Sequence, residues 1–296
     1  MTIANVVPTI WSARLLDTFE RTAVYADMLT DVSAEVASDG NKVELGRITT
    51  DPTIGDYTKG TDITFQTLAD AKTTLSIDQE KYWALSLDDI DAAQAKPALM
   101  EPAVGKAARK LARVFDDYVA GVLAPSSVAA ANKTAMGSTA FGASSADDLG
   151  DVTDAQAKAF VLKINEVLAT KIQQANWDAE VRGTISTDAA GIIRQHLIAT
   201  GAGSDGLQDS VLLEGQLSRF LGIRLRIDTN MASGVLRTAG TPLLRIFASD
   251  AAYWAAQINR VEFGRHEKQF GDFAKGLMVY GAVKSPYGEK LHVIEV

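Results

Sequence analysis

The sequence predicts an α+β fold, and three observations lead to this prediction. Apolar and polar residues alternate with period two between residues 43 and 87, as in strands. A long helical pattern follows at about residues 97–123, and helical and strand patterns alternate after residue 150. Hairpin-like strands on either side of a mixed middle part are typical of α+β proteins, and 296 residues are enough for about two domains.

Composition excludes several classes of protein. The chain carries 29 Lys and Arg against 37 Asp and Glu, a net charge of −8, so it lacks the basic excess of a general nucleic-acid binder. Hydrophobic residues make up 47%, which excludes a wholly disordered chain. The absence of Cys removes disulfides, thiolate catalysis and cysteine-bound metals. The sequence has no apolar run of about 18 residues and no basic cluster near residue 1, so we expect neither a membrane partner nor a signal peptide.

The N-terminal part predicts a helix and then a ribbon. Trp11, Leu15 and Phe19 recur at helical spacing and indicate a short amphipathic helix. The strand patterns of residues 43–87 are interrupted by turn residues at 50–61, which favours a long antiparallel ribbon with few apolar side chains. Because a two-stranded ribbon is only marginally stable in water, it must lie on its own body or on another subunit.

The strongest helical pattern runs from Pro102 to Leu123, and Pro125 ends it. Apolar residues recur there at steps of three and four, and at 1.5 Å per residue the helix is about 30 Å long. The polar residues of its opposite face are Lys106, Arg109, Lys110 and Arg113.

The middle of the chain alternates between helices and strands. Residues 125–150 are rich in Ala, Ser and Gly and predict a surface loop or linker. Thr153 and Gln156 have capping-box spacing at the start of a helix that reaches Ile172. A strand is expected at 181–185, and Thr187 or Asp188 is the expected cap of a helix through residue 198.

The C-terminal part is predicted to be rich in strands. A short helix is expected at 213–221, with Gly222 as its C′ residue, and a second one at 249–256. The expected strands are Ile223–Ile227, Leu243–Ala248, Val261–Phe263, Leu277–Val283 and His292–Val296.

Candidate motifs for chemistry are weak. Gly201-Ala-Gly-Ser-Asp-Gly206 matches G-x-G-x-x-G, but a dinucleotide site needs a strand before the motif, and here a helix precedes it. An acidic cluster and the three histidines lack the spacing of an EF-hand or a zinc protease. These residues are Asp88, Asp89, Asp91, His196, His266 and His292. We expect no enzyme activity, no cofactor and no metal; a nucleotide-binding enzyme that uses the 201–206 loop is an alternative of a different class.

Three N-terminal stretches carry a family resemblance. They are Ile10-Trp-Ser-Ala-Arg-Leu-Leu16 with Tyr25 downstream, Lys42-Val-Glu-Leu-Gly46, and Ile54-Gly-Asp-Tyr-Thr58. The first resembles the N-terminal arm helix of the Hong Kong 97-type major capsid (coat) proteins of tailed bacteriophages. The other two resemble one side of the extended loop of that family.

Three later stretches extend the resemblance. Leu75-Ser-Ile-Asp-Gln79 and Asp88-Asp-Ile-Asp-Ala-Ala-Gln-Ala95 are similar to the return of the extended loop and the entry to the spine helix. Glu214 to Asn230 resembles a helix–Gly–strand unit of the axial domain. The resemblance is good over about residues 5–125 and patchier after that.

The resemblance implies a Hong Kong 97-type capsid fold that is divided along the chain. The implied segments are an N-terminal arm (1–42), an extended β-ribbon loop (43–84), a peripheral domain with a long spine helix (85–150), an axial α/β domain (151–244), and a return to the peripheral domain with C-terminal strands (245–296).

The resemblance also implies a function. The chain is expected to be a major capsid protein, a structural subunit that self-assembles as hexamers and pentamers into the icosahedral head shell around double-stranded DNA. The implied partners are copies of itself, a separate scaffolding protein, a portal, and packaged DNA through loose, non-specific contacts. The implied location is the virion, after assembly in the cytoplasm of the bacterial host. An encapsulin-like bacterial compartment has the same fold and is the nearest alternative.

Seven residues are expected at contacts between subunits. They are Trp11 and Leu15 in the arm, Tyr57, Lys59 and Asp62 at or near the ribbon tip, and Arg109 and Arg113 on the polar face of the spine helix. Each such contact can be weak, because closed symmetry engages many of them at once.

Overall fold

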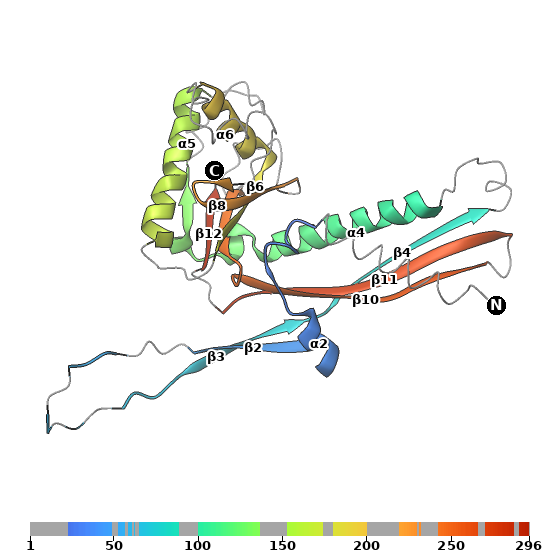
Figure 1. Ribbon diagram of the computed structural model, residues 1–296, viewed down its shortest axis with the longest axis horizontal. Helices are drawn as coiled ribbons and strands as arrows, with labels where there is room; N and C mark the ends of the chain where they lie inside the picture. The colour runs from blue at the N-terminus through green and yellow to red at the C-terminus, as the bar shows by residue number, and fades with distance from the viewer. Residues whose placement is uncertain are drawn as a thin grey trace.

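The computed structural model shows two β-sheets with helices packed on them and a two-stranded ribbon that protrudes from the body (Figure 1). Its mixture of helices and strands agrees with the α+β prediction. Within the part of the chain that the structure describes, no helix is long and apolar enough to cross a membrane. The described residues are 23–48, 53–56, 59–60, 62, 65–88, 100–136, 153–173, 180–199, 219–229, 231, 242–265, 270–286 and 290–295.

A four-stranded sheet carries the longest helix. Its strands lie in the order β1 (Thr30–Asp31), β10 (Ala252–Arg265), β11 (Gly271–Lys284) and β4 (Gln79–Asp88). β11 pairs antiparallel with β10 on one side and with β4 on the other, whereas β1 runs parallel to β10. The helix α4 (Met100–Val122) lies along this sheet (Figure 1), which confirms the helix predicted from Pro102 to Leu123.

One apolar stripe attaches α4 to the sheet. The stripe residues, which recur at steps of three and four, are Val104, Ala108, Leu111, Phe115 and Val119, and all of them are buried. The ring of Phe115 lies edge-on to Trp254 of β10 and to Tyr280 of β11, with ring centroids 5.2 and 5.5 Å away. The helix therefore covers one face of the sheet and turns its Lys and Arg residues to solvent.

A six-stranded sheet forms the second body. Its order is β5 (Lys133–Ala135), β12 (Leu291–Glu295), β9 (Pro242–Ala248), β6 (Val181–Ser186), β8 (Ile223–Asp228) and β7 (Arg219–Phe220). The helix α5 (Asp154–Val167), the π-helical turn Leu168–Gln173 and the helix α6 (Thr187–Ala199) share one apolar core with this sheet. Large members of this core are Phe160, Ile164, Ile185, Ile193 and Ile246.

The connection between the two bodies contains more structure than the predicted loop. Two short 3-10 turns, Pro125–Ser127 and Ala130–Asn132, lead into β5, which pairs in parallel with β12. The rest of the predicted loop, residues 137–150, lies outside the described residues.

Both helices of the second body begin at a polar cap. The capping box predicted at Thr153 is confirmed, because its backbone N–H donates to Oε1 of Gln156 at 2.8 Å. At α6 the cap is Ser186, whose Oγ accepts the backbone N–H of Ala189 at 3.2 Å. Thr187 or Asp188 was predicted as this cap, which was wrong by one residue or two. Ser186, Thr187 and Asp188 are adjacent and all have side chains that can cap a helix, so the sequence does not distinguish them.

The ribbon is built from β2 (Lys42–Ile48) and β3 (Asp70–Ser76), which pair antiparallel from Lys42 opposite Ser76 to Ile48 opposite Asp70. The short helix α2 (Ser33–Asp39) packs at its base. The strand pattern at Trp83 and Leu87 belongs to β4 of the four-stranded sheet and not to this ribbon.

Two helix predictions were wrong, one of them at the last three residues of the helix predicted at 213–221. Arg219–Phe220 is a strand, and Leu221 and Gly222 form a two-residue hairpin turn with φ values of 49° and 83° between Phe220 and Ile223. A turn of this length in a hairpin favours positive φ at both residues, so Gly222 serves a hairpin and not a helix end. The remaining residues of that predicted helix that precede Arg219 lie outside the described residues.

The other wrong helix was predicted at 249–256. This stretch makes a turn after Ala248 and enters β10 at Ala252, where Trp254 and Ala255 are buried. Pairing with β11 overrides the local helix preference of an Ala-rich sequence. The domain boundary predicted at residue 244 falls inside β9, and β12 from the C-terminal segment lies in the same sheet as β6.

The Phe115 contacts predict a large loss of stability on truncation. Phe115→Ala removes a fully buried ring and is expected to lower the free energy of unfolding by about 3–5 kcal/mol. The matched control Phe65→Ala, at a ribbon side chain that is 91% exposed, is expected to change it by less than about 0.5 kcal/mol. Urea unfolding followed by circular dichroism measures both. Equal effects of the two substitutions would contradict this packing of α4.

Candidate interaction surfaces and the joint that positions them

The ribbon buries its base and exposes its outer part. At the base, Val43 and Leu75 pack with Val32 and Val36 in a small apolar cluster. Further out, the large apolar side chains are exposed, by 63% at Ile48, 97% at Ile54, 91% at Phe65 and 69% at Leu68. Exposed apolar surface that gathers on one protruding element marks a surface for interaction with another protein.

Polar contacts hold the two sides of the ribbon together. Lys72 pairs with Glu44 across the strands at 3.0 Å, with both side chains exposed. Beyond the strand pairs, Gln66 accepts the backbone N–H of Thr53 at 2.9 Å and donates to its hydroxyl at 2.7 Å. These contacts join the two sides of the ribbon beyond the strand pairs, where the apolar side chains that the structure describes are exposed.

The predicted contact residues lie on two exposed elements. Lys59 and Asp62 are exposed near the ribbon tip, where Gly60 adopts a φ of 90°. Arg109 and Arg113 are exposed on α4. The structure thus separates these two pairs onto different surfaces. Trp11, Leu15 and Tyr57 lie outside the described residues.

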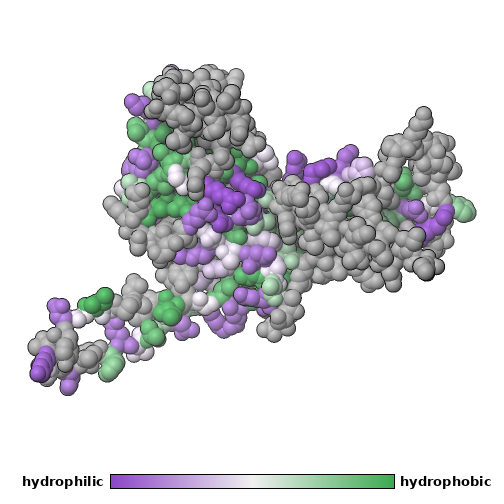
Figure 2. Space-filling model, viewed as in Figure 1, coloured by the Kyte–Doolittle hydropathy of each residue, from purple (hydrophilic) through white to green (hydrophobic). Residues whose placement is uncertain are grey.

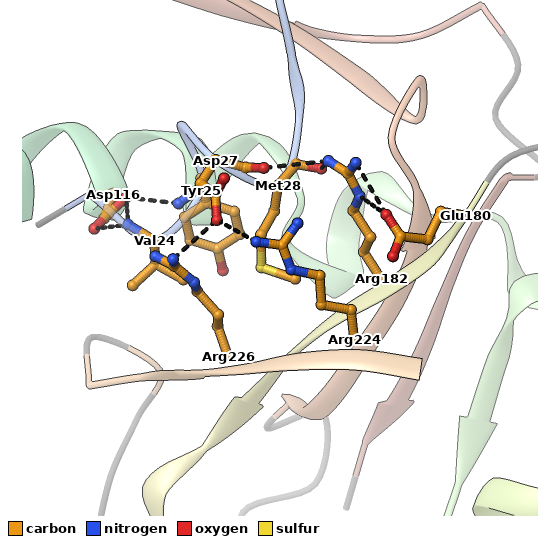
Figure 3. A network of polar contacts seen from close by, with 9 residues as sticks. All are labelled: Val24, Tyr25, Asp27, Met28, Asp116, Glu180, Arg182, Arg224 and Arg226. Atoms are coloured by element: carbon orange, nitrogen blue, oxygen red, sulfur yellow. Dashed lines mark hydrogen bonds and ion pairs between the residues drawn. The ribbon is translucent and has the colours of Figure 1, made fainter. Parts of the chain in front are cut away.

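A short segment, Ala23–Met28, joins α4 to the six-stranded sheet (Figure 3). We call this segment, with the side chains that hold it, the joint. On the α4 side, the carboxylate of Asp116 accepts the backbone N–H groups of Val24, at 2.9 and 3.1 Å, and of Tyr25, at 3.1 Å. These bonds fix the backbone of the segment to the helix.

On the sheet side, three arginines hold the same segment. Arg224 and Arg226 of β8 both reach the carboxylate of Asp27, at 2.7 and 2.9 Å. Arg182 of β6 donates to the carbonyl oxygens of Asp27 and Met28 at 3.2 and 3.0 Å and pairs with Glu180. Figure 3 shows these arginines converging on the segment from neighbouring strands.

The side chain of Tyr25 is buried in the core and anchors the segment Ala23–Met28 there. Its hydroxyl donates to Oδ2 of Asp228 at 2.7 Å and accepts from Nη1 of Arg245 at 2.6 Å, and the hydroxyl of Thr184 lies 3.3 Å away. All four side chains are buried, and burial raises the pKa of the Tyr25 hydroxyl. A buried polar group must find such partners, so these contacts tie the segment to β6, β8 and β9.

Burial is also the largest cause of the shifted pKa of Asp116. It raises the pKa of this carboxyl to about 7, against the backbone N–H groups of Val24 and Tyr25, which lower it, while the Asp228 and Asp117 carboxylates raise it further. Sequence reasoning missed Asp116, Asp228 and Arg245. The available signal was an aspartate between Ala112 and Val119 on the apolar stripe of α4.

The other motifs of the sequence do not assemble into a site among the described residues. His292 is buried, and its Nε2 lies 2.8 Å from the Thr134 hydroxyl. Burial, and then Lys171, lower its pKa to about 4. No group of three acidic or histidine side chains that could hold a metal occurs in the described ranges. The loop 201–206, Asp89, Asp91, His266 and the side chains of Asp88 and His196 lie outside them.

Comparison with solved structures identifies the fold. The chain is similar to a structure from Mycobacterium phage Che8, with 24% identity over 92% of this chain and 90% of that chain and a TM-score of 0.64. It is also similar to the capsid of Cyanophage P-SCSP1u, with 15% identity over 92% and 88% of the two chains and a TM-score of 0.68. The chain has a capsid-protein fold.

A third similar structure is the capsid of an empty GTA particle, with 14% identity over 93% of this chain and 90% of that chain and a TM-score of 0.62. No family model and no curated protein matches the sequence. The capsid-protein fold agrees with the Hong Kong 97-type fold that the sequence resemblance implied.

Asp116 predicts a specific dependence of stability on pH. Its carboxyl is protonated below about pH 7 in the folded protein but only below about pH 4 in the unfolded chain. The folded state therefore binds more protons between these values, and this group makes it less stable as the pH rises through that window. Asp116→Asn removes the effect. The free energy of unfolding of the variant, relative to the unsubstituted chain, is expected to rise between about pH 5 and about pH 8 in urea titrations.

His292 acts with the opposite sign, since its lowered pKa makes the folded state less stable as the pH falls from about 6.5 to about 4. It is present in both proteins, so its effect cancels in the difference. Asp56→Asn, on the exposed ribbon, controls for the loss of one carboxylate. A constant difference between the Asp116 variant and the unsubstituted chain across the window would show that the carboxyl is not perturbed by burial.

Proposed function

We propose that the chain is the major capsid protein of a tailed bacteriophage, a structural and non-catalytic subunit of the icosahedral head shell around double-stranded DNA. The observation that carries the proposal is the shared fold with phage and GTA-particle capsids over 92–93% of the chain. A likeness that covers 92–93% of the chain is more than the likeness of one common domain.

The exposed ribbon supports a function that requires assembly. Its outer apolar side chains gain partners only on a neighbouring molecule, because they are 63–97% exposed in the single chain. A specific contact buries more than about 1,000 Å² in total, which a protruding ribbon can supply together with the surface that it crosses. Many such contacts in a closed shell add up even when each one is weak.

Within this proposal the segments take the roles that the sequence resemblance implied. Of the implied extended loop, residues 43–84, the part from β2 to β3 lies over a neighbour, because Gln79 and the residues after it belong to β4 of the four-stranded sheet. The helix α4 is the spine helix of the peripheral domain. The six-stranded sheet with α5 and α6 is the axial domain, near the five-fold and six-fold axes. β10 and β11 are the return of the chain to the peripheral domain, while β12 lies in the axial sheet.

The proposed contact residues follow from the same roles. Trp11 and Leu15 anchor the arm, and Tyr57, Lys59 and Asp62 contact a neighbour at the ribbon tip. Arg109 and Arg113 contact a neighbour from the exposed face of α4. The exposure of Lys59, Asp62, Arg109 and Arg113 in the single chain is consistent with these contacts.

The proposed partners are copies of the chain in hexamers and pentamers, a separate scaffolding protein and a portal. The proposed location is the virion, after assembly in the host cytoplasm. DNA contacts are loose and non-specific, and the net charge of −8 favours a wall that does not adhere to packaged DNA. The solved structures described above come from phage and GTA particles, which favours a head shell over an encapsulin-like compartment or a nucleotide-binding enzyme.

Assembly tests the proposal directly. The chain is expressed alone and with a candidate scaffolding protein, and is studied by size-exclusion chromatography and negative-stain electron microscopy. We expect closed shells, tubes or capsomer rings in at least one preparation. A uniform small oligomer in both preparations, combined with thermal stabilisation by nucleotides, would contradict the capsid function and favour the enzyme.

The ribbon provides a second prediction. Deletion of residues 50–62 is expected to leave a folded, soluble subunit, because the described residues of this stretch are exposed and the clusters at the ribbon base do not include them. The same deletion is expected to abolish shells, since it removes the part that reaches a neighbour. Circular dichroism confirms the fold, and electron microscopy counts particles. Normal shells from the deleted chain would rule out this role of the ribbon.

A further inference from the structure

The exposed side of α4 is strongly basic. From Pro102 to Phe115 the sequence has four basic residues and no acidic one. Residues three and four apart lie on the same face of a helix, so the four cations form one row, which at 1.5 Å per residue is about 10 Å long. All four are exposed: Lys106, Arg109, Lys110 and Arg113.

The neighbouring strand adds a fifth cation. A groove of about 400 Å³ runs between α4 and β4, and of the described residues that line it every charged one is a lysine. These lysines are Lys81 of β4, which is exposed, and Lys106 and Lys110 of α4. We call the five residues Lys81, Lys106, Arg109, Lys110 and Arg113 the basic face. It gathers five positive charges at one place in a chain whose net charge is −8.

Two aspartates near the C-terminal end of α4 lie outside the basic face. Asp116 is 3% exposed and accepts the backbone N–H groups of Val24 and Tyr25, so it belongs to the joint. Asp117 is exposed one turn after Arg113, and the basic face ends there. The basic face therefore carries one sign of charge over its whole length.

The helix α4 and the base of the ribbon lie on opposite faces of the four-stranded sheet. Tyr280 of β11 packs against Phe115 of α4, whereas Val279 packs in the cluster at the ribbon base with Val43 and Leu75. Neighbouring residues of a strand point to opposite faces of a sheet. Figure 1 shows α4 on one side of the sheet and α2 and the ribbon on the other, and Figure 2 shows hydrophilic side chains along the outer side of α4. The basic face therefore points away from the side that carries the ribbon.

The two sides of the sheet differ in charge as well. Between residues 51 and 70 the ribbon has four aspartates and one lysine, so the ribbon is acidic where the side of α4 is basic. In a shell, one side of the wall faces outward and the other faces the contents. Double-stranded DNA has one negative charge per about 1.7 Å of its axis, so it attracts a basic surface and repels an acidic one. This charge difference favours the side of α4 as the one that faces DNA.

We propose that the basic face is the surface of the subunit that contacts packaged double-stranded DNA, through its phosphate groups. The inference rests on the proposed function, and it names the surface that the loose, non-specific DNA contacts use. One DNA strand has a phosphate about every 3.4 Å of axis, so a row about 10 Å long faces about three of them. Lysine and arginine contacts to phosphates carry no sequence preference. For Arg109 and Arg113, DNA then takes the place of a neighbouring subunit as the partner.

DNA binding by the full-length, unassembled subunit is the first test. The probes are two short, fluorescently labelled duplexes of unrelated sequence, and anisotropy measures their binding. We expect equal affinity for the two sequences. For about four phosphate contacts, the affinity is expected to fall about 100-fold between about 50 and about 200 mM salt.

Charge-changed variants locate the binding surface. Lys106→Glu with Lys110→Glu is expected to lower the affinity at least about tenfold, whereas Lys106→Arg with Lys110→Arg keeps it. The matched control, Lys158→Glu with Lys171→Glu, makes the same change of net charge at two exposed positions on α5 and the turn after it. It is expected to change the affinity by less than about twofold, because its charges lie away from the contact. Circular dichroism confirms that all variants fold.

Cysteine labelling in assembled particles tests which way the basic face points, because the natural chain contains no Cys. In empty closed particles, Arg109→Cys is expected to react with a small maleimide that passes through the shell but not with a maleimide on a bulky polymer. The unassembled variant is expected to react with both reagents. Reaction with the polymer in closed particles would place this residue outside and overturn the inference. Protection from the small reagent would show that a neighbouring subunit or a scaffold covers it, and would overturn the inference too.

The outcomes separate this inference from the proposed function, because duplex binding is measured without particles. A chain that forms particles but does not bind the duplexes would overturn the basic face as a DNA surface and leave the capsid function standing. An equal loss of affinity in the Lys106/Lys110 and Lys158/Lys171 glutamate variants would show an effect of net charge alone and would overturn it as well. Subunits that bind DNA through the basic face but form no particles, alone or with scaffold, would overturn the capsid function and leave the DNA surface standing.

Discussion

The arrangement of the molecule depends on the contacts of the segment Ala23–Met28. Asp116 holds its backbone on α4, while Arg182, Arg224 and Arg226 hold it on the six-stranded sheet. These bonds add to the covalent connection between the two sheets, so they set the direction of α4 relative to the six-stranded sheet. Under the proposed function, a subunit that contacts several neighbours at once needs this direction to be fixed.

Burying charged side chains at the joint costs stability. Their presence therefore suggests that they serve the orientation of the segment. Asp116, Asp228 and Arg245 are each less than 5% exposed, and an unpaired charge at any of them would destabilise the fold by about 3–5 kcal/mol. Apolar side chains of similar volume at these three positions would pack as well, but they would not fix the orientation of α4 relative to the six-stranded sheet. We take the buried network as a device for orientation more than for stability, since its hydrogen bonds to Val24 and Tyr25 are directional.

Most regular elements followed from the sequence, whereas the joint did not. The stripe from Val104 to Val119 predicts α4, because a period of 3.6 residues is visible within one element. The strand at Trp254 was missed because its partner lies on β11, and pairing at a distance leaves no local pattern. For the same reason the spacing of Asp116 and Asp228 along the chain says nothing about their proximity. The predicted contact residues Lys59, Asp62, Arg109 and Arg113 are exposed in the single chain, and their contacts with neighbouring subunits stay predictions.

The exposed apolar residues must support association without causing aggregation. Ile48, Ile54, Phe65 and Leu68 are spread along a narrow ribbon and separated by polar residues, so they do not form one broad patch. Such a spread favours weak single contacts in the proposed shell, and the net charge of −8 opposes aggregation of isolated subunits. A closed shell, as proposed, engages many such contacts at once, so each one can be weak. The proposed shell therefore requires the orientation of α4 relative to the six-stranded sheet to be the same in every subunit, and the contacts of the segment Ala23–Met28 fix that orientation.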